Sequence, residues 1–162
     1  MVIRSEMWGL RFAGLMLSVS FCFSAAYAET ESSKARGGKL YDKWYAVTGA
    51  KAPESTHPLY PADGKYAAEP KSNWRCKECH GWDYQGADGA YGSGSHFTGF
   101  PGVIGSSLTV EELVAQISGQ ADSEHDFSAM GEQAIADLAT FIGEALEDYG
   151  QFIAEDKSIV GG

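Results

Sequence analysis

Five consecutive residues, Cys76-Lys77-Glu78-Cys79-His80, restrict what this chain can fold into more than any other stretch. Two cysteines that are three positions apart lie on the same side of one helical turn, and a histidine follows directly. The turn therefore presents two thiols and an imidazole to a common neighbour. Whatever fold the chain adopts has to leave room for that neighbour.

Several chemistries use a C-x-x-C pattern, and the rest of the chain separates them. A thioredoxin-like redox pair comes with a proline between the cysteines and a βαβ context, and the sequence shows neither. A zinc site needs four ligands, but residues 29–162 hold no cysteine besides Cys76 and Cys79. C-x-x-C-H is the attachment sequence of a c-type haem, in which both thiols bond to vinyl groups and His80 binds the iron. We therefore predict one haem c, attached through Cys76 and Cys79.

Residues 1–28 have the pattern of a secretory signal peptide. Arg4 and Arg11 provide positive charge, Phe12 to Phe23 form an apolar run, and Ala26-Tyr27-Ala28 is an A-x-A cleavage sequence. The apolar run is short of the ~20 residues that a membrane helix needs. An uncleaved N-terminal anchor is the alternative. We expect export to the periplasm, cleavage after Ala28 and no membrane span in the mature chain.

Charge is distributed unevenly along the exported part. Residues 29–107 are neutral overall, whereas residues 108–162 carry twelve carboxylates and a single lysine, Lys157. Nucleic acid needs basic partners, so this composition argues against a nucleic-acid-binding function. An acidic half favours a redox partner with a basic docking surface, attracted at long range. The alternative is a soluble acidic surface without a partner.

Hydrophobic periodicity predicts an all-α domain with three longer helices and no strand of any length. The expected helices are 37–47, 109–118 and 132–148, and Thr109 and Glu112 form a capping box at the start of the second. Glycines 49, 119 and 150 are the expected stops. The apolar faces contain Leu40, Tyr41, Trp44 and Val47, then Leu113, Val114 and Ile117, then Ile135, Leu138, Ala139, Ile142 and Leu146.

The segments between these helices are rich in proline and glycine. Five residues between 50 and 73 are Pro or Gly, which predicts an irregular insertion. Residues 81–105 contain eight glycines, which favours a backbone that wraps closely around another group. We expect residues 29–36 to be a flexible leader, 37–148 to be the domain and 149–162 to be a C-terminal tail.

A haem iron with both axial positions filled needs a second ligand besides His80. Met130 is the only methionine beyond the predicted signal peptide, and it lies on the expected loop before the last helix. We predict Met130 as the second axial ligand. His125, on the same loop, is the next candidate, and His57, His96 or an open site are further alternatives.

The residues beyond position 28 resemble a class I monohaem cytochrome c of the bacterial, periplasmic kind. The resemblance rests on Gly38-Lys39-Leu40-Tyr41, on Cys76 to His80, on the Met130 loop and on Leu138-Ala139-Thr140-Phe141-Ile142. It implies a helical fold around one covalently attached haem, here with long irregular Gly/Pro-rich loops. It also implies that the first and last helices cross, with Gly38, Tyr41 and Phe141 at the contact.

Two features depart from the family pattern. About 25 residues separate the first helix from the cysteines, where the family has few. The family also has a proline soon after the haem histidine, whose carbonyl accepts a hydrogen bond from the ring. The only proline after His80 is Pro101, 21 residues later. The resemblance implies that Pro101 takes this role.

We expect the chain to be an electron carrier and not an enzyme, with iron cycling between Fe(II) and Fe(III). Met sulfur and an apolar pocket both favour the ferrous state, so we expect a relatively high reduction potential. Trp82 and Phe100, together with Trp74 and Tyr84, are candidates for the pocket wall. The alternatives are a dedicated haem subunit of a periplasmic oxidoreductase, and a haem sensor or enzyme with a labile distal ligand.

Overall fold

A computed structural model describes residues 13–148, 152 and 160, with side chains described from Thr30 onward. The chain divides into two compact units, residues 1–32 and 33–162. The signal peptide predicted over 1–28 and most of the tail predicted over 149–162 lie outside the described side chains. Among the described residues, no helix combines the length and apolar character that a membrane span requires.

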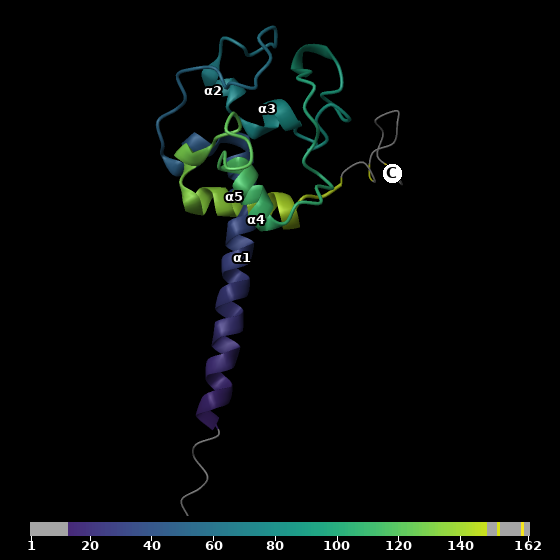
Figure 1. The fold of residues 1–162 in the computed structure, drawn as a ribbon. Helices are drawn as coiled ribbons and strands as arrows, with labels where there is room; N and C mark the ends of the chain where they lie inside the picture. The colour runs from purple at the N-terminus through teal and green to yellow at the C-terminus, as the bar shows by residue number, and fades with distance from the viewer. Residues whose placement is uncertain (1–12, 149–151, 153–159, 161–162) are drawn as a thin grey trace, which may run out of the picture. The chain divides into compact units, whose positions relative to one another are not determined.

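The described residues form α-helices, two short 3₁₀ helices and no strand, so the predicted all-α class is confirmed for this part of the chain (Figure 1). The elements in order are α1 (Ala13–Thr48), α2 (Pro70–Asn73), α3 (Cys76–His80), η1 (Gly94–His96), α4 (Val110–Ile117), η2 (Ser128–Met130) and α5 (Glu132–Glu144). Two isolated bridges pair Gly86 with Pro101 and Ser118 with Asp126.

Helix α1 begins well before the predicted start at Gly37. Residues 29–36, expected to be a flexible leader, are helical instead. The difference has a tertiary cause, because Arg36 forms an ion pair with Asp137 of α5 and Lys34 Nζ lies 3.5 Å from a Glu144 oxygen. The far end follows the prediction: α1 ends at Thr48, where Gly49 takes a φ of +73°.

The two later helices start where the sequence predicts. At α4, Thr109 Oγ1 accepts from Glu112 N at 3.2 Å, and Glu112 Oε2 accepts from Thr109 N at 2.8 Å, which is the expected capping box. Helix α5 ends at Glu144, earlier than the predicted Asp148. Leu146, beyond this end, still packs partly against the core.

The part of α1 after Ser32 crosses α5 at a close contact between backbones. Gly37 is buried, and a Cβ there would overlap the Cβ of Phe141 and the carbonyl oxygen of Asp137. Gly38 is less confined, since a Cβ would meet Phe141 Cε2 at 3.3 Å. The Tyr41 and Phe141 rings lie 6.2 Å apart at the same contact. The crossing expected from the resemblance is present, with Gly37 as its tightest residue.

The core is formed by the apolar faces of α1, α4 and α5 and by the loop that joins the last two. Its buried residues are Leu40, Tyr41, Trp44, Tyr45, Leu113, Ile117, Phe127, Met130, Ala134, Ile135, Leu138, Ala139 and Ile142. These include nine of the twelve predicted apolar-face positions, and the other three, Val47, Val114 and Leu146, are partly buried against the same cluster, so the helical period identifies the packing surfaces.

Polar groups of α1 hold α3, the short helix that carries the C-x-x-C-H sequence. Tyr41 Oη donates to Gly81 O at 2.8 Å, and Trp44 Nε1 donates to Trp74 O at 3.0 Å. Asp42 pairs with Arg75 and accepts from Lys77 Nζ at 2.8 Å. These bonds bracket α3 on both sides, so the cysteines and His80 are positioned by the first helix despite the long insertion between them.

The insertion over 50–73 is irregular, as predicted, but it is closely tied to the domain. Asn73, 1% exposed, accepts from His57 N at 3.0 Å and donates to Tyr66 O at 2.8 Å. Helix α2 then starts at Pro70, the first-turn position at which proline costs no hydrogen bond. The insertion therefore delivers His57 to the interior.

Candidate functional site

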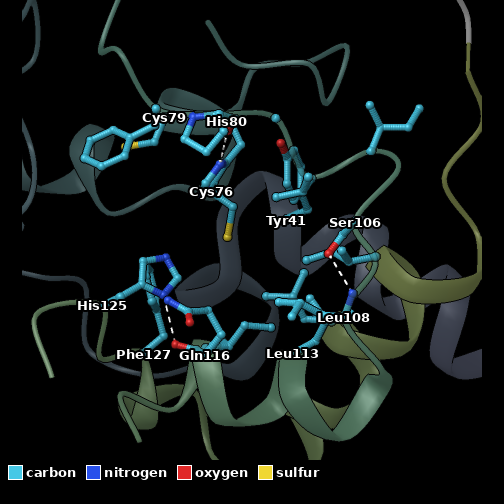
Figure 2. Close-up of a pocket in the computed structure, with 18 of the residues that line it drawn as sticks. Tyr41, Cys76, Cys79, His80, Ser106, Leu108, Leu113, Gln116, His125 and Phe127 are labelled. Atoms are coloured by element: carbon cyan, nitrogen blue, oxygen red, sulfur yellow. Dashed lines mark hydrogen bonds between the residues drawn. The ribbon is translucent and has the colours of Figure 1, made fainter. Parts of the chain in front are cut away.

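A cavity of about 640 Å³ lies between α3 and the segment after it on one side, and α4 and the α4–α5 loop on the other (Figure 2). Residues from several parts of the domain line it: Tyr41, His57, Leu59, Asn73, Arg75, Cys76, Cys79, His80, residues 100–108, Leu113, Gln116, Ile117, Asp122, His125, Phe127, Leu138 and Ile142. Binding sites for cofactors commonly have this volume and this mostly apolar lining.

The two cysteines are free thiols at this cavity, and Figure 2 shows the Cys76 sulfur projecting into it. Burial raises the pKa of Cys76 and of Cys79 to about 12 each. A redox-active pair needs the opposite, a thiolate stabilised by a lowered pKa. The site therefore favours thiols held for another reaction over a dithiol switch.

His80 lies at the end of α3 with one ring nitrogen already used. Its Nδ1 is 2.7 Å from the carbonyl oxygen of Pro101. A carbonyl only accepts, so Nδ1 carries the proton and Nε2 keeps its lone pair. Burial lowers the pKa of His80, which keeps the ring neutral. This tautomer leaves Nε2 available to bind a metal.

The Pro101 carbonyl is held in place by the glycine-rich segment that the sequence singled out. Gly86 N donates to His80 O at 2.9 Å, and Ala87 N donates to Phe100 O at 2.8 Å. Gly86 has a φ of +55°, and a Cβ there would lie about 2.5 Å from Phe100 O. Only glycine allows this close approach. The 21-residue gap between His80 and Pro101 is thus closed by a tight backbone pairing.

His125 lies across the cavity from His80, below it in Figure 2. The two ring centroids are 6.3 Å apart and the ring planes are inclined by 76°. His125 Nδ1 is 3.0 Å from the carbonyl oxygen of Gln116 in α4. A neutral ring that donates this bond carries its proton on Nδ1 and has its lone pair on Nε2. His80 and His125 therefore line the same cavity, and each uses its Nδ1 for a hydrogen bond to a backbone carbonyl.

His57 also lines the cavity, but its ring is in the other tautomer. Its Nδ1 accepts from Leu59 N at 3.2 Å, so a neutral ring carries its proton on Nε2. The ring is 4% exposed and packs against Trp74 at 4.3 Å between centroids. Nε2 is buried without a hydrogen-bond partner. Burial lowers the pKa of His57 to about 4.

The buried His57 predicts a specific loss of stability in acid. Its pKa is about 4 in the folded protein against about 6.5 when unfolded, so the unfolded chain takes up the proton first as pH falls. Stability should fall between pH 6.5 and 4 by at most about 3 kcal/mol and level off below. Denaturant unfolding at pH 7 and pH 4.5 measures this. His57→Gln should show a smaller drop, and an equal drop in both proteins would contradict the assignment.

The structure separates the other predicted site residues. Phe100 and Pro101 line the cavity, and the Phe100 ring lies 6.5 Å from that of His80. Met130 does not line it: the residue is 5% exposed within the hydrophobic core. Trp82 also lies outside the lining, 52% exposed, with Lys77 Nζ 3.5 Å over its ring. Trp74 and Tyr84 pack against the core and do not line the cavity.

His96, the remaining alternative, lies away from the cavity lining. Its Nδ1 is 3.6 Å from Glu78 Oε2, its Nε2 is 3.2 Å from Lys65 Nζ, and its ring lies 4.9 Å from that of Tyr91. It joins the insertion to the glycine-rich segment. Of the four histidines, His80 and His125 alone combine a place in the lining with a Nδ1 that donates to a carbonyl.

Sequence reasoning named His125 only as a secondary candidate. The sequence favoured methionine as the second ligand of a haem attached through C-x-x-C-H. The sequence pattern does not show which residue of the 120–131 loop faces the cavity. The only sequence feature that pointed to His125 as a ligand was its position between acidic residues on a short loop that joins two predicted helices.

Comparison with known proteins shows no relative: no family model, no curated sequence and no solved structure matches the chain. Within the described residues, no three His, Cys, Asp or Glu side chains gather as they would around a metal ion held by side chains alone.

Proposed function

We propose that this chain is a monohaem c-type cytochrome that transfers electrons. The observation that supports the proposal is the convergence of Cys76, Cys79 and His80 on one cavity, with His80 Nδ1 bonded to Pro101 O so that Nε2 is available. A haem fits these residues: the thiols are protonated and accessible to the cavity, the walls are largely apolar, and an imidazole lone pair is available.

The chain's own groups have definite tasks in such a protein. A bound haem supplies a one-electron Fe(II)/Fe(III) couple. The Pro101 carbonyl orients the His80 ring and makes its Nε2 a better donor. Phe100, Leu113 and Leu138 line the cavity and would exclude water from a haem bound there. Fixed ligands and a dry pocket reduce the rearrangement that accompanies each electron transfer.

The proposal includes export to the periplasm, supported by the signal-peptide pattern of residues 1–28. Attachment of haem through thioethers would then claim Cys76 and Cys79, which an oxidising compartment otherwise tends to join as a disulfide. The predicted periplasmic location and the two free thiols at the cavity both support covalent haem attachment.

A basic redox protein is the partner that the charge distribution favours. Residues 108–148 include no lysine or arginine, and Asp122, Glu124 and Asp126 flank His125 on the loop beside the cavity. Long-range attraction to such a surface speeds encounter and weakens as salt screens it.

The decisive experiment is expression of the full chain together with a haem-attachment system, followed by purification from the periplasm. We expect one haem per chain that survives denaturation, and reversible one-electron oxidation and reduction. Electron exchange with a basic redox protein should slow as ionic strength rises. Protein that folds and is exported without covalent haem would refute the proposal, whereas a salt-independent exchange rate would refute only the basic partner.

A further inference from the structure

We infer that His125, and not Met130, is the second axial ligand of the haem iron. The inference rests on the proposed function and adds to it the identity of the distal ligand. It gives the cavity two imidazole ligands, from α3 and from the α4–α5 loop, and replaces the His80 and Met130 pair predicted from the sequence.

The spacing of the two rings is that of imidazoles on opposite sides of one metal. A metal–imidazole bond is about 2 Å long, so two such nitrogens across a metal are about 4 Å apart. The radii of the two rings account for the rest of the 6.3 Å between the His80 and His125 centroids. The separation of the two centroids therefore matches that of two imidazoles bound to one iron from opposite sides.

The hydrogen bonds of the ring nitrogens indicate the same two histidines, independently of the distance between the rings. His80 Nδ1 donates to Pro101 O at 2.7 Å and His125 Nδ1 donates to Gln116 O at 3.0 Å. Metal-binding histidines commonly make such a bond through the nitrogen that does not bind, which leaves Nε2 for the metal. His57, in the opposite tautomer, is not prepared in this way.

The loop that carries His125 is closed at its base, so the ring is positioned before any ligand binds. Ser118 and Asp126 form a bridge, and Phe127 N donates to Ile117 O at 2.9 Å. Gly119 has a φ of +76° and lies so close to Asp126 that a Cβ would be 2.8 Å from the Asp126 Cβ. Such pre-positioning lowers the entropy lost on coordination.

Met130 has a different task in the same loop. It ends the 3₁₀ helix η2, its N donates to Phe127 O at 2.9 Å, and its side chain is buried with the core residues next to α5. Bringing its sulfur to the iron would require this core contact to break. A methionine that fills core space is the commoner role of this residue.

A second imidazole changes the electronic properties expected of the haem. Nitrogen is a harder donor than thioether sulfur, and methionine ligation is what raises the potential of many cytochromes c. We therefore expect a lower potential than the sequence-based assignment implied. The 76° between the rings also matters, since nearly perpendicular planes act equally on both π-bonding iron d orbitals. Near-equal orbital energies make the ferric EPR signal strongly anisotropic.

Optical and EPR spectra of the ferric holoprotein, with three variants, test the assignment. Met130→Leu preserves volume and should leave both spectra and the potential unchanged. His125→Ala should open the distal position, with a change of spin state and rapid binding of added imidazole. His125→Met should produce the sulfur-to-iron absorption band that the native protein lacks and raise the potential.

Each result decides the question. A sulfur-to-iron band in the native protein that Met130→Leu abolishes would overturn the inference while leaving the proposed function intact. Native spectra that survive both His125 variants would overturn it in favour of a third ligand. If His125→Ala does not mature, the native and Met130→Leu spectra still decide between histidine and methionine. A chain that attaches no haem would refute the proposed function itself.

Discussion

Replacing both Cys76 and Cys79 with alanine is expected to abolish covalent haem attachment completely. In the proposed cytochrome each thiol would supply one of the two bonds to the haem, so no covalent link would remain in the double variant. Haem that stays with the polypeptide on a denaturing gel measures the effect. The native protein should keep all of its haem, and the double variant should keep none.

The same double variant should also lose cooperative folding. A cavity of about 640 Å³ is lined by residues of α1, α3, α4, α5 and the loops between them, so a bound haem would contact all of these elements. A ligand that binds only the folded state adds its binding free energy to stability. Thermal unfolding should become broad or move to much lower temperature. A fully cooperative transition at the native temperature would contradict this dependence.

Single replacements provide the matched control. Cys76→Ala and Cys79→Ala each leave one thiol on the same helical turn as His80. We expect each to retain part of the covalent haem with His80 still bound to iron. Equal and complete loss in both single variants would mean that the thiols are needed for recognition by the attachment system more than for the bonds themselves.

Replacing Gly37 with alanine is expected to destabilise the protein by about 3 kcal/mol or more, the upper end of what overpacking costs. In an ordinary helix interior this change stabilises by up to about 1 kcal/mol, so the sign itself is diagnostic. The reason is the crossing of α1 and α5, where a Cβ at position 37 would overlap Phe141 Cβ and Asp137 O. The obstacle includes backbone, which cannot move without separating the helices. Denaturant unfolding of the holoprotein measures the change.

Gly38→Ala is the control for the same helix. Its Cβ would meet only the outer ring atoms of Phe141, the nearest at 3.3 Å, and a small rotation of that ring relieves the contact. We expect a change within about 1 kcal/mol, because the helix propensity gained offsets the crowding. If Gly38→Ala proved the more damaging of the two, the helices would cross one residue further along α1.

Much of the fold is legible in the sequence because it depends on local rules. Thr109 and Glu112 cap α4, Gly49 ends α1, and the 3.6-residue period marks the faces that form the core. Residues 29–36, predicted to be a leader, are part of helix α1, and two of them, Lys34 and Arg36, form ion pairs with α5, about a hundred positions away. A short polar segment is predicted as a flexible leader when its ion-pair partners lie far away in the sequence.

The site divides in the same way. Cys76, Cys79 and His80 are close together in the sequence, so one helical turn is enough to present them together, and the sequence by itself predicts a haem as the group that they bind. The opposite wall was decided only by tertiary structure. Whether His125 or Met130 faces the cavity depends on how the loop closes between Ser118 and Asp126 and on which carbonyl of α4 the imidazole meets. Those contacts join residues that are not related by any local sequence pattern. The resulting geometry favours two imidazoles as axial ligands, whereas the sequence favoured one imidazole and one methionine.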